Sequence, residues 1–331
     1  MPRQVASGRR TLAGAMVGGA LALAVVACGG PPPAVDGDLT DGWPGFPEAA
    51  VFMPEAGTCH REAFRPVVAA QEYQPVDCEE PHLLETVHVG TFTGKPAKAD
   101  EPPAPGSTAL RRAFEECEER AADHLGADYR HGLLWLGVAV PTPAAWGAGA
   151  RWFRCDLSQL DSVVGDPVTR EGDLAGALAE DSPLRLGCWV VEIGKGGKVV
   201  EEKPVPCDEP HDAEFVGVWR APDGPYPDPA DHAGTVHEGC LSRVAAYTGV
   251  PDDGDVRYRV GAIADWMSER DWANGNRGFR CRLLVAEPVT GSLRDAGPEA
   301  LPVRHEGPGR ASRRRRATAP GRPPPRDRHP R

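Results

Sequence analysis

Apolar positions recur at helical spacing within GSTALRRAFEECEERAADHLG, residues 106–126. Ser107 can cap the N-terminus of this helix, and Gly126 can end it. One stripe is apolar and predicts a buried face; it consists of Leu110, Ala113, Phe114, Cys117, Ala121 and Leu125. A second stripe, before Gly249, consists of Val236, Cys240, Val244 and Tyr247. We therefore expect one main helix in each half of the chain, with a Cys on its buried face.

Alternating apolar residues predict strands around these helices. In the first half the strands cover residues 85–92, residues 133–141 and a last stretch with Phe153, Cys155 and Leu157 on one face. In the second half they cover residues 214–219 and a last stretch with Phe279, Cys281 and Leu283 on one face. The predicted fold class is α+β: two tandem repeats, each a small antiparallel sheet with one main helix, stapled by disulfides.

Two motifs occur twice, in the same order. PVDCEEPHLLE at residues 75–85 matches PVPCDEPHDAE at 204–214 in seven of eleven positions. WGAGARWFRCDL at residues 146–157 matches WANGNRGFRCRL at 272–283 in seven of twelve positions. The duplication predicts two modules of a common domain size.

The duplication and the changes in composition divide the chain into six parts. These are a lipoprotein signal peptide (1–27), a flexible tether (28–48), module 1 (49–160), a polar linker (161–180), module 2 (181–288) and a disordered basic tail rich in Pro and Arg (289–331).

The N-terminal segment is basic at first and then uncharged over seventeen residues. This pattern predicts a secretory signal, because a membrane span needs about 20 apolar residues. The segment ends in VVAC, which resembles the bacterial lipobox, and Cys28 would carry acyl chains such as palmitate. An ordinary signal peptide and an uncleaved anchor helix are the alternatives. The Gly- and Pro-rich residues after Cys28 would hold the folded part away from the bilayer.

The C-terminal tail has no apolar periodicity, which predicts disorder. From Thr290 on it holds eleven Arg and four acidic residues, a net charge of +7, whereas residues 28–289 carry a net charge of −21. The tail could contact anionic lipid or a wall polymer, or it could stay solvated without a partner. We expect no nucleic-acid binding, because the acidic body would repel the phosphates.

Eight of the nine Cys follow Cys28. An even number in an exported chain favours disulfides over zinc, and the chain has no close CxxC pair. The helical Cys and the Cys of the last strand both face the core, which favours their pairing. The predicted disulfides are Cys59–Cys78, Cys117–Cys155, Cys188–Cys207 and Cys240–Cys281.

The repeated motifs and the regular Cys spacing resemble the septum-formation family domain. The resemblance covers both modules and implies two tandem copies in a lipoprotein of the type exported by high-GC Gram-positive bacteria. It implies a role at the cell envelope connected with cell division. The resemblance assigns no catalytic residue to this chain.

The Pro-His pair of the first motif allows a metal, a catalytic and a structural interpretation. As metal ligands, His82 and Glu85 would recur as His211 and Glu214, but a zinc site needs at least three ligands. As a general base, neither His has a repeated Ser or Thr nucleophile near it. We therefore expect no metal site and no catalytic residue.

The structural interpretation is a corner that begins a strand, with binding as a further role. A carboxylate on the inner face of a strand needs a partner. Each Arg lies two residues before a core Phe, so in a regular strand it lies on the same inner face as that Phe. We therefore predict that Glu85 pairs with Arg151 and that Glu214 pairs with Arg277.

Pro and Trp residues complete the two motifs. Pro81 and Pro210 exclude helix from the residue before them and open the strand that follows. Trp146 and Trp272 are predicted to cover the edge of each core, with ligand stacking as the alternative.

Together these features predict a non-enzymatic extracytoplasmic lipoprotein, anchored in the cell membrane by its N-terminal lipid. We expect it to bind a protein or glycan at the envelope and to need no cofactor. An envelope hydrolase that uses the acidic and His motifs is one alternative, and a structural or sensory spacer is another.

Overall fold

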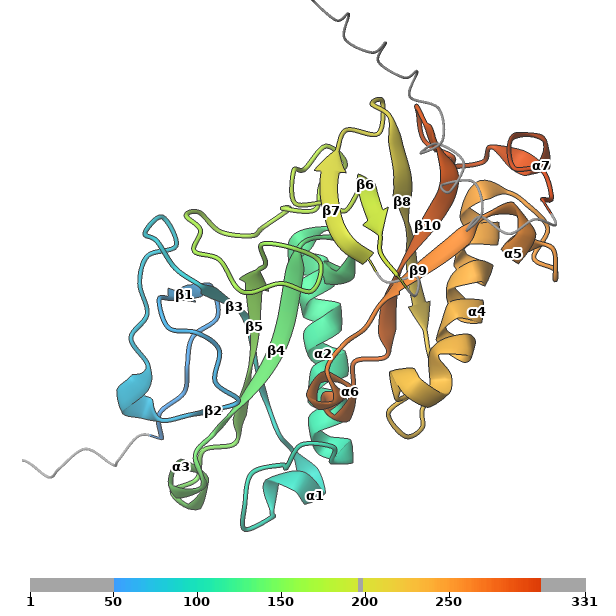
Figure 1. Cartoon of the computed structure of the whole chain (residues 1–331). Helices are drawn as coiled ribbons and strands as arrows, with labels where there is room; N and C mark the ends of the chain where they lie inside the picture. The colour runs from blue at the N-terminus through green and yellow to red at the C-terminus, as the bar shows by residue number, and fades with distance from the viewer. Residues whose placement is uncertain (1–50, 196–198, 305–331) are drawn as a thin grey trace, which may run out of the picture. The chain divides into compact units, whose positions relative to one another are not determined.

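The computed structural model describes residues 51–195 and 199–304, which lie in one unit that begins at Val51. The chain forms two five-stranded sheets, each crossed by one long helix (Figure 1). The predicted α+β class is therefore confirmed.

Module 1 has the strand order β1-β3-β5-β4-β2. Its strands are β1 (Thr58–His60), β2 (Val67–Val68), β3 (Leu84–Thr91), β4 (Leu134–Pro141) and β5 (Trp152–Gln159). Neighbouring strands are antiparallel, except that β2 and β4 are parallel. Its helical elements are η1 (Ala70–Glu72), α1 (Gly94–Ala97), α2 (Thr108–Leu125), η2 (Tyr129–His131) and α3 (Pro143–Gly147).

Module 2 has the strand order β7-β6-β8-β10-β9, with antiparallel neighbours throughout. Its strands are β6 (Cys188–Ile193), β7 (Val199–Val205), β8 (His211–Arg220), β9 (Gly261–Asp265) and β10 (Gly278–Val289). Its helices are α4 (Pro229–Thr248), α5 (Val256–Arg259), α6 (Glu269–Asn274) and α7 (Gly297–Ala300).

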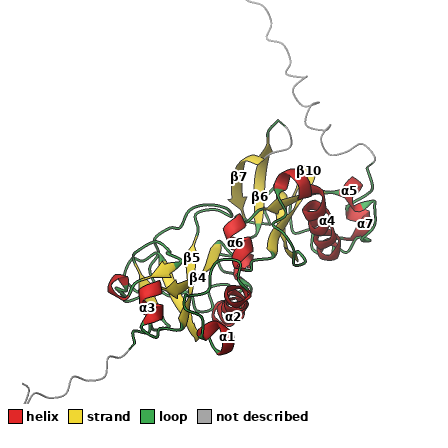
Figure 2. Cartoon of the chain, turned by 90° about the horizontal axis from the view of Figure 1, so that it is seen from below, coloured by secondary structure: helices red, strands yellow, loops and turns green. Residues whose placement is uncertain are grey.

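The order β1-β3-β5-β4 of module 1 recurs as β6-β8-β10-β9 in module 2, so the duplicated motifs occupy equivalent strands. Figure 2 shows a sheet with its long helix, α2 or α4, in each half. The two modules differ at the sheet edges, where β2 extends the first sheet beside β4 and β7 extends the second beside β6.

The helix α2 begins and ends where the sequence predicts. Ser107 Oγ accepts a hydrogen bond from the Leu110 amide at 3.2 Å, and Gly126 ends the helix at a φ of 83°. A left-handed residue at a helix end favours Gly, which has no Cβ to clash. All six residues of the predicted stripe on α2 are buried.

The four disulfides join the cysteines in the predicted pairs. In each module one bridge fastens the long helix to the last inner strand, β5 or β10. The other bridge links the first strand to the turn before the Pro-His pair. Each closed loop should stabilise the fold by about 3–4 kcal/mol, chiefly by restricting the unfolded chain.

Two segments that we placed outside the modules belong to their cores. Leu174 and Leu178 are buried in the core of module 1, so residues 161–180 are not a free linker. Val289 ends β10, and Leu293 and Leu301 are buried in the core of module 2, so the prediction of a disordered tail is wrong for residues 289–304. In both segments a few leucines in a polar sequence cover the end of a core.

The predicted signal peptide, the lipidation site Cys28, the tether 28–48 and residues 305–331 of the tail lie outside the described residues. Among the residues that the structure does describe, no helix is long and apolar enough to cross a membrane.

Candidate functional site

The duplicated corner has the same geometry in both modules. His82 Nδ1 lies 2.8 Å from the Glu80 carbonyl oxygen, and His211 Nδ1 lies 2.8 Å from that of Glu209. A carbonyl accepts, so Nδ1 carries the proton and Nε2 keeps a lone pair. Both rings are buried, and neither Nε2 atom has a hydrogen-bond partner among the described residues.

Glu85 holds the segment that contains Leu174 against the sheet of module 1. Its Oε2 accepts from the Leu174 amide at 2.7 Å, and its Oε1 lies 2.7 Å from His124 Nε2. The carboxylate is buried, and its hydrogen bond raises the pKa of His124 against the opposing effect of burial. The predicted corner is therefore structural in module 1, but its partners are a backbone amide and a helix side chain.

Glu214 does the same in module 2. Its carboxylate accepts from the Leu293 amide at 2.9 Å, from the Tyr247 hydroxyl at 2.5 Å and from the Ser292 hydroxyl. Burial and the hydrogen bond to Glu214 raise the pKa of Tyr247 to about 12. Each repeated Glu thus anchors the leucine-bearing segment that covers its own core.

The predicted pairs of Glu85 with Arg151 and of Glu214 with Arg277 are wrong. Arg151 precedes the first residue of β5, so its side chain turns to the corner and donates to the carbonyls of Trp146 and Ala97, each at 2.6 Å. Arg277 likewise precedes β10.

Each of these Arg instead lies against its own Trp. The guanidinium carbon of Arg151 is 4.2 Å from the Trp146 ring centroid, and that of Arg277 is 4.0 Å from the Trp272 ring centroid. Both indole N–H groups donate to backbone carbonyls, and both rings are buried. The Trp residues therefore close the core edge, as predicted, and offer no exposed ring to a ligand.

A buried polar chain on the opposite face of the first sheet was not foreseen. His60 Nε2 lies 3.1 Å from Thr86 Oγ1, which donates to Asp156 Oδ1 at 2.8 Å; Arg154 Nε donates to Asp156 Oδ2 at 2.9 Å. Burial, with a smaller effect from Arg154, lowers the pKa of His60 to about 4. His60 and Arg154 also line a cavity of about 240 Å³.

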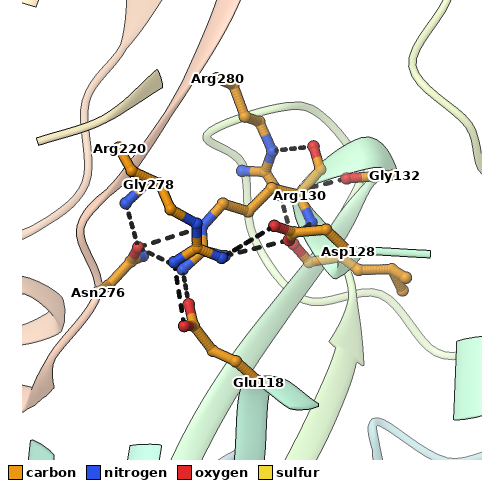
Figure 3. Close-up of polar contacts among 9 residues, drawn as sticks. Glu118, Asp128, Arg130, Gly132, Arg220, Asn276, Gly278 and Arg280 are labelled. Carbon is orange, nitrogen blue, oxygen red and sulfur yellow. Dashed lines mark hydrogen bonds and ion pairs between the residues drawn. The ribbon is translucent and has the colours of Figure 1, made fainter. Parts of the chain in front are cut away.

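Charged side chains join the two modules around Arg130 (Figure 3). Its guanidinium contacts Glu118 and donates to Asp128 at 3.1 Å within module 1, and it donates to Asn276 Oδ1 of module 2 at 2.7 Å. Arg220 of module 2 reaches back to the same two carboxylates, each at 3.2 Å. Arg130 is 1% exposed, so this network is well shielded from water at its centre.

Arg280 of β10 makes a second connection between the modules. It donates to the carbonyl oxygens of Arg130 at 3.0 Å, Val163 at 3.2 Å and Leu134 at 2.6 Å. A guanidinium offers five donors in a fixed fork, which suits a site made of several carbonyls. Burial lowers the pKa of Arg280, although Tyr129 and Asp265 oppose the shift.

A groove of about 430 Å³ lies beside these contacts, lined by residues of both modules. Its apolar lining includes Phe64 and Trp135 of module 1, Val164 of the segment that connects the modules, and Trp266 and Met267 of module 2. Its polar lining includes Ser158, Asp265 and Asp271. Trp135 Nε1 donates to Asp271 Oδ1 at 3.3 Å, so the groove wall is also tied across the modules.

A family model described as Septum formation matches residues 56–295. The chain belongs to the septum-formation family. No curated protein and no solved structure matches it. The family match runs from before β1 to just after Leu293, so it includes both modules, the Arg130 network, the groove and the segment held by Glu214.

In this septum-formation protein, sequence patterns did not reveal the groove or the network. Arg130 and Asn276 are 146 residues apart in the chain. Arg130 lies outside the repeated motifs, and Asn276 lies in the second copy of the Trp motif at a position where the first copy has Ala150. The apolar groove residues were visible only as strand or loop positions. The residues Asp265, Trp266 and Met267, at the end of the short strand β9, carry no sequence pattern that indicates a contact with another module.

Proposed function

We propose that this septum-formation protein is a non-enzymatic, lipid-anchored binding module at the extracytoplasmic face of the cell membrane. Cys28 would carry the lipid, and the basic tail would contact anionic lipid or wall polymer. A protein or glycan partner would bind in the groove between the modules. The observation that carries the proposal is the groove itself, because concave sites with several aromatic residues and a few polar groups are typical of ligand binding.

The construction of the groove supports this assignment. Phe64 and Trp135 pack edge to face with ring centroids 4.7 Å apart, so the ring of Trp135 is held in one orientation. The Trp135 contact with Asp271 and the Arg280 contacts with module 1 join the two walls. A wall that is ordered before binding loses less entropy when the partner arrives.

Burial of the repeated motif supports a non-enzymatic role. His82, Glu85, His211 and Glu214 are each at most 2% exposed, and both carboxylates are engaged with backbone amides. A general base must come within hydrogen-bond reach of its substrate. A catalytic role for these residues would require the corner to open.

Photo-crosslinking in cells would test the groove. A crosslinking amino acid at Val164, which is 69% exposed in the groove lining, should capture a discrete partner. The same amino acid at Val190 of β6, which is exposed but does not line the groove, is the matched control. Capture at Val164 should fall when Trp266→Ala removes part of the groove wall. Equal capture from both positions would contradict the proposal.

A further inference from the structure

The corner of module 2 gathers side chains that can bind a metal ion. Ligand atoms of Cys188, His211 and Glu214 lie within 4.8 Å of one another, and all three residues are buried. Cys207 is joined to Cys188 by a disulfide, so a second sulfur is at the same place. Two sulfurs, an imidazole and a carboxylate make up a ligand set that suits tetrahedral zinc.

His211 is oriented as a metal ligand would be. Its Nδ1–H donates to the Glu209 carbonyl at 2.8 Å, which directs the lone pair of Nε2 away from that carbonyl. Ligating imidazoles commonly have this arrangement, because the second nitrogen fixes the ring and its tautomer. His211 is 0% exposed and its Nε2 has no hydrogen-bond partner among the described residues. Such a buried acceptor without a partner is costly.

We propose that module 2 has a second, reduced state in which Cys188, Cys207, His211 and Glu214 bind one zinc ion. A dithiol reductant supplies the two electrons: its thiolate attacks a sulfur of the disulfide, and its second thiol then closes the reductant's own disulfide. Cys188 and Cys207 are released as thiols. Each loses its proton when its sulfur binds Zn²⁺, so two protons leave as one metal ion enters.

The accessibility of the disulfides favours reduction at this position. Cys207 is partly exposed, whereas both sulfur-bearing residues of Cys240–Cys281 are 0% exposed. A reductant can therefore reach the corner bridge while the bridge that holds α4 to β10 stays closed. The Cys240–Cys281 disulfide in the core of module 2 would stay intact in the zinc-bound state.

Module 1 supplies an internal control. Cys78 is also partly exposed, so the Cys59–Cys78 bridge can also be reduced. Yet within residues 51–195 and 199–304 only the corner of module 2 brings a metal-binding group together. Both repeated carboxylates are engaged, Glu85 by the Leu174 amide and His124, and Glu214 by the Leu293 amide and two hydroxyls. In the zinc state Oε1 of Glu214 would bind the metal in place of the hydroxyls of Tyr247 and Ser292, while Oε2 keeps the Leu293 amide. The proposal therefore predicts one zinc ion per chain, at module 2.

Metal titration of the full-length protein in detergent would test this. The protein is treated with limiting dithiothreitol, the reductant is removed, and peptide mapping of an alkylated aliquot identifies the conditions in which only the two corner bridges are open. The unalkylated remainder of such a sample should bind about one equivalent of Zn²⁺, and Co²⁺ as a probe should give a thiolate charge-transfer band. The oxidised protein should bind none. Zinc should in turn protect Cys188 and Cys207 from alkylation.

Variants at the two corners distinguish a specific zinc site from nonspecific zinc binding by the released thiols. His211→Gln should weaken zinc binding by about 100-fold, an effect at least as large as the loss of a supporting residue around a metal. His82→Gln, the matched change in module 1, should leave it unchanged. Equal effects of both variants, or no zinc binding by wild-type chains with open corner bridges, would overturn the proposal. Glu214→Gln, which keeps an oxygen for the Leu293 amide, gives a second test if His211→Gln does not fold.

Discussion

Replacing Glu85 with Ala should lower the free energy of unfolding by about 3 kcal/mol, the lower end of the usual cost of breaking a buried ion pair. The carboxylate is 2% exposed and accepts from the Leu174 amide at 2.7 Å. Ala leaves that amide buried without an acceptor, which alone costs about 1–3 kcal/mol. The contact with His124 adds less, because the imidazole is 26% exposed and stays partly solvated.

Double-mutant cycles in denaturant unfolding of the oxidised full-length protein separate the partners of Glu85. Glu85→Ala and His124→Ala should couple by about 0.5–2 kcal/mol, as contacting residues do. Glu85→Ala and Arg151→Ala should be additive within about 0.5 kcal/mol, because Arg151 contacts other residues. Glu85→Gln, which keeps an acceptor for Leu174, is the control and should cost less than Glu85→Ala.

The coupling between Glu85 and His124 should depend on pH. The hydrogen bond to Glu85 raises the pKa of His124 above its unfolded value, which is about 6.5. Protonated His124 therefore stabilises the fold fully below pH about 6.5, and this contribution is lost as the pH rises through the folded pKa. A coupling that grows from acidic to alkaline pH, or a larger coupling of Glu85 with Arg151, would refute the assignment.

Three further changes have defined outcomes. Arg130→Ala should cost about 3 kcal/mol, the lower end of the usual range for a broken buried ion pair, because Glu118 and Asp128 keep only the exposed Arg220 as a partner. Calorimetry should then show the modules melting separately, and an unchanged single transition would contradict this. The pKa of His60 is about 4 in the fold, below its unfolded value of about 6.5, so unfolding takes up a proton between these pH values. The free energy of unfolding should therefore be highest above pH about 6.5 and should decline as the pH falls towards 4. In melts at several pH values, His60→Gln should reduce this decline. Cys28→Ala should abolish incorporation of labelled fatty acid, and equal labelling would exclude the lipobox.

Local patterns were sufficient to predict the long helices, the inner strands and the disulfides. An apolar stripe such as Leu110 to Leu125 predicts a buried helix face without any knowledge of what packs against it. The duplication showed which Cys occupy equivalent positions in the two modules, and this supported the predicted disulfides. The order of the strands was not predicted and is known from the structure, where β5 and β10 take equivalent positions.

The Glu–Arg pairs could not be predicted correctly from strand parity. A register shift between Thr86 and His88 interrupts the alternation in β3, so Val89 packs on the opposite side from Val87. The prediction also assumed that residues alternate between the two faces from Phe153 back to Arg151. The strand β5 begins at Trp152, so this alternation does not apply to Arg151. The true partner, the Leu174 amide, lies 89 residues away in the sequence and carries no side-chain signal.

The repeated strand explains why the junction between the modules is a stronger candidate for function than the repeated motif. Arg154 and Arg280 occupy equivalent positions, each directly before the bridged Cys of the last strand. Arg154 stays inside module 1, where it pairs with Asp156, whereas Arg280 crosses to the carbonyls of module 1. The inward positions kept their residues because both cores need the same packing. The outward Arg also recurs, but its outward neighbours changed: Arg282 stands where module 1 has Asp156, and Gly278 stands where it has Trp152. Without the carboxylate that pairs with Arg154, Arg280 donates to module 1 and borders the groove, so a partner-specific role is expected there.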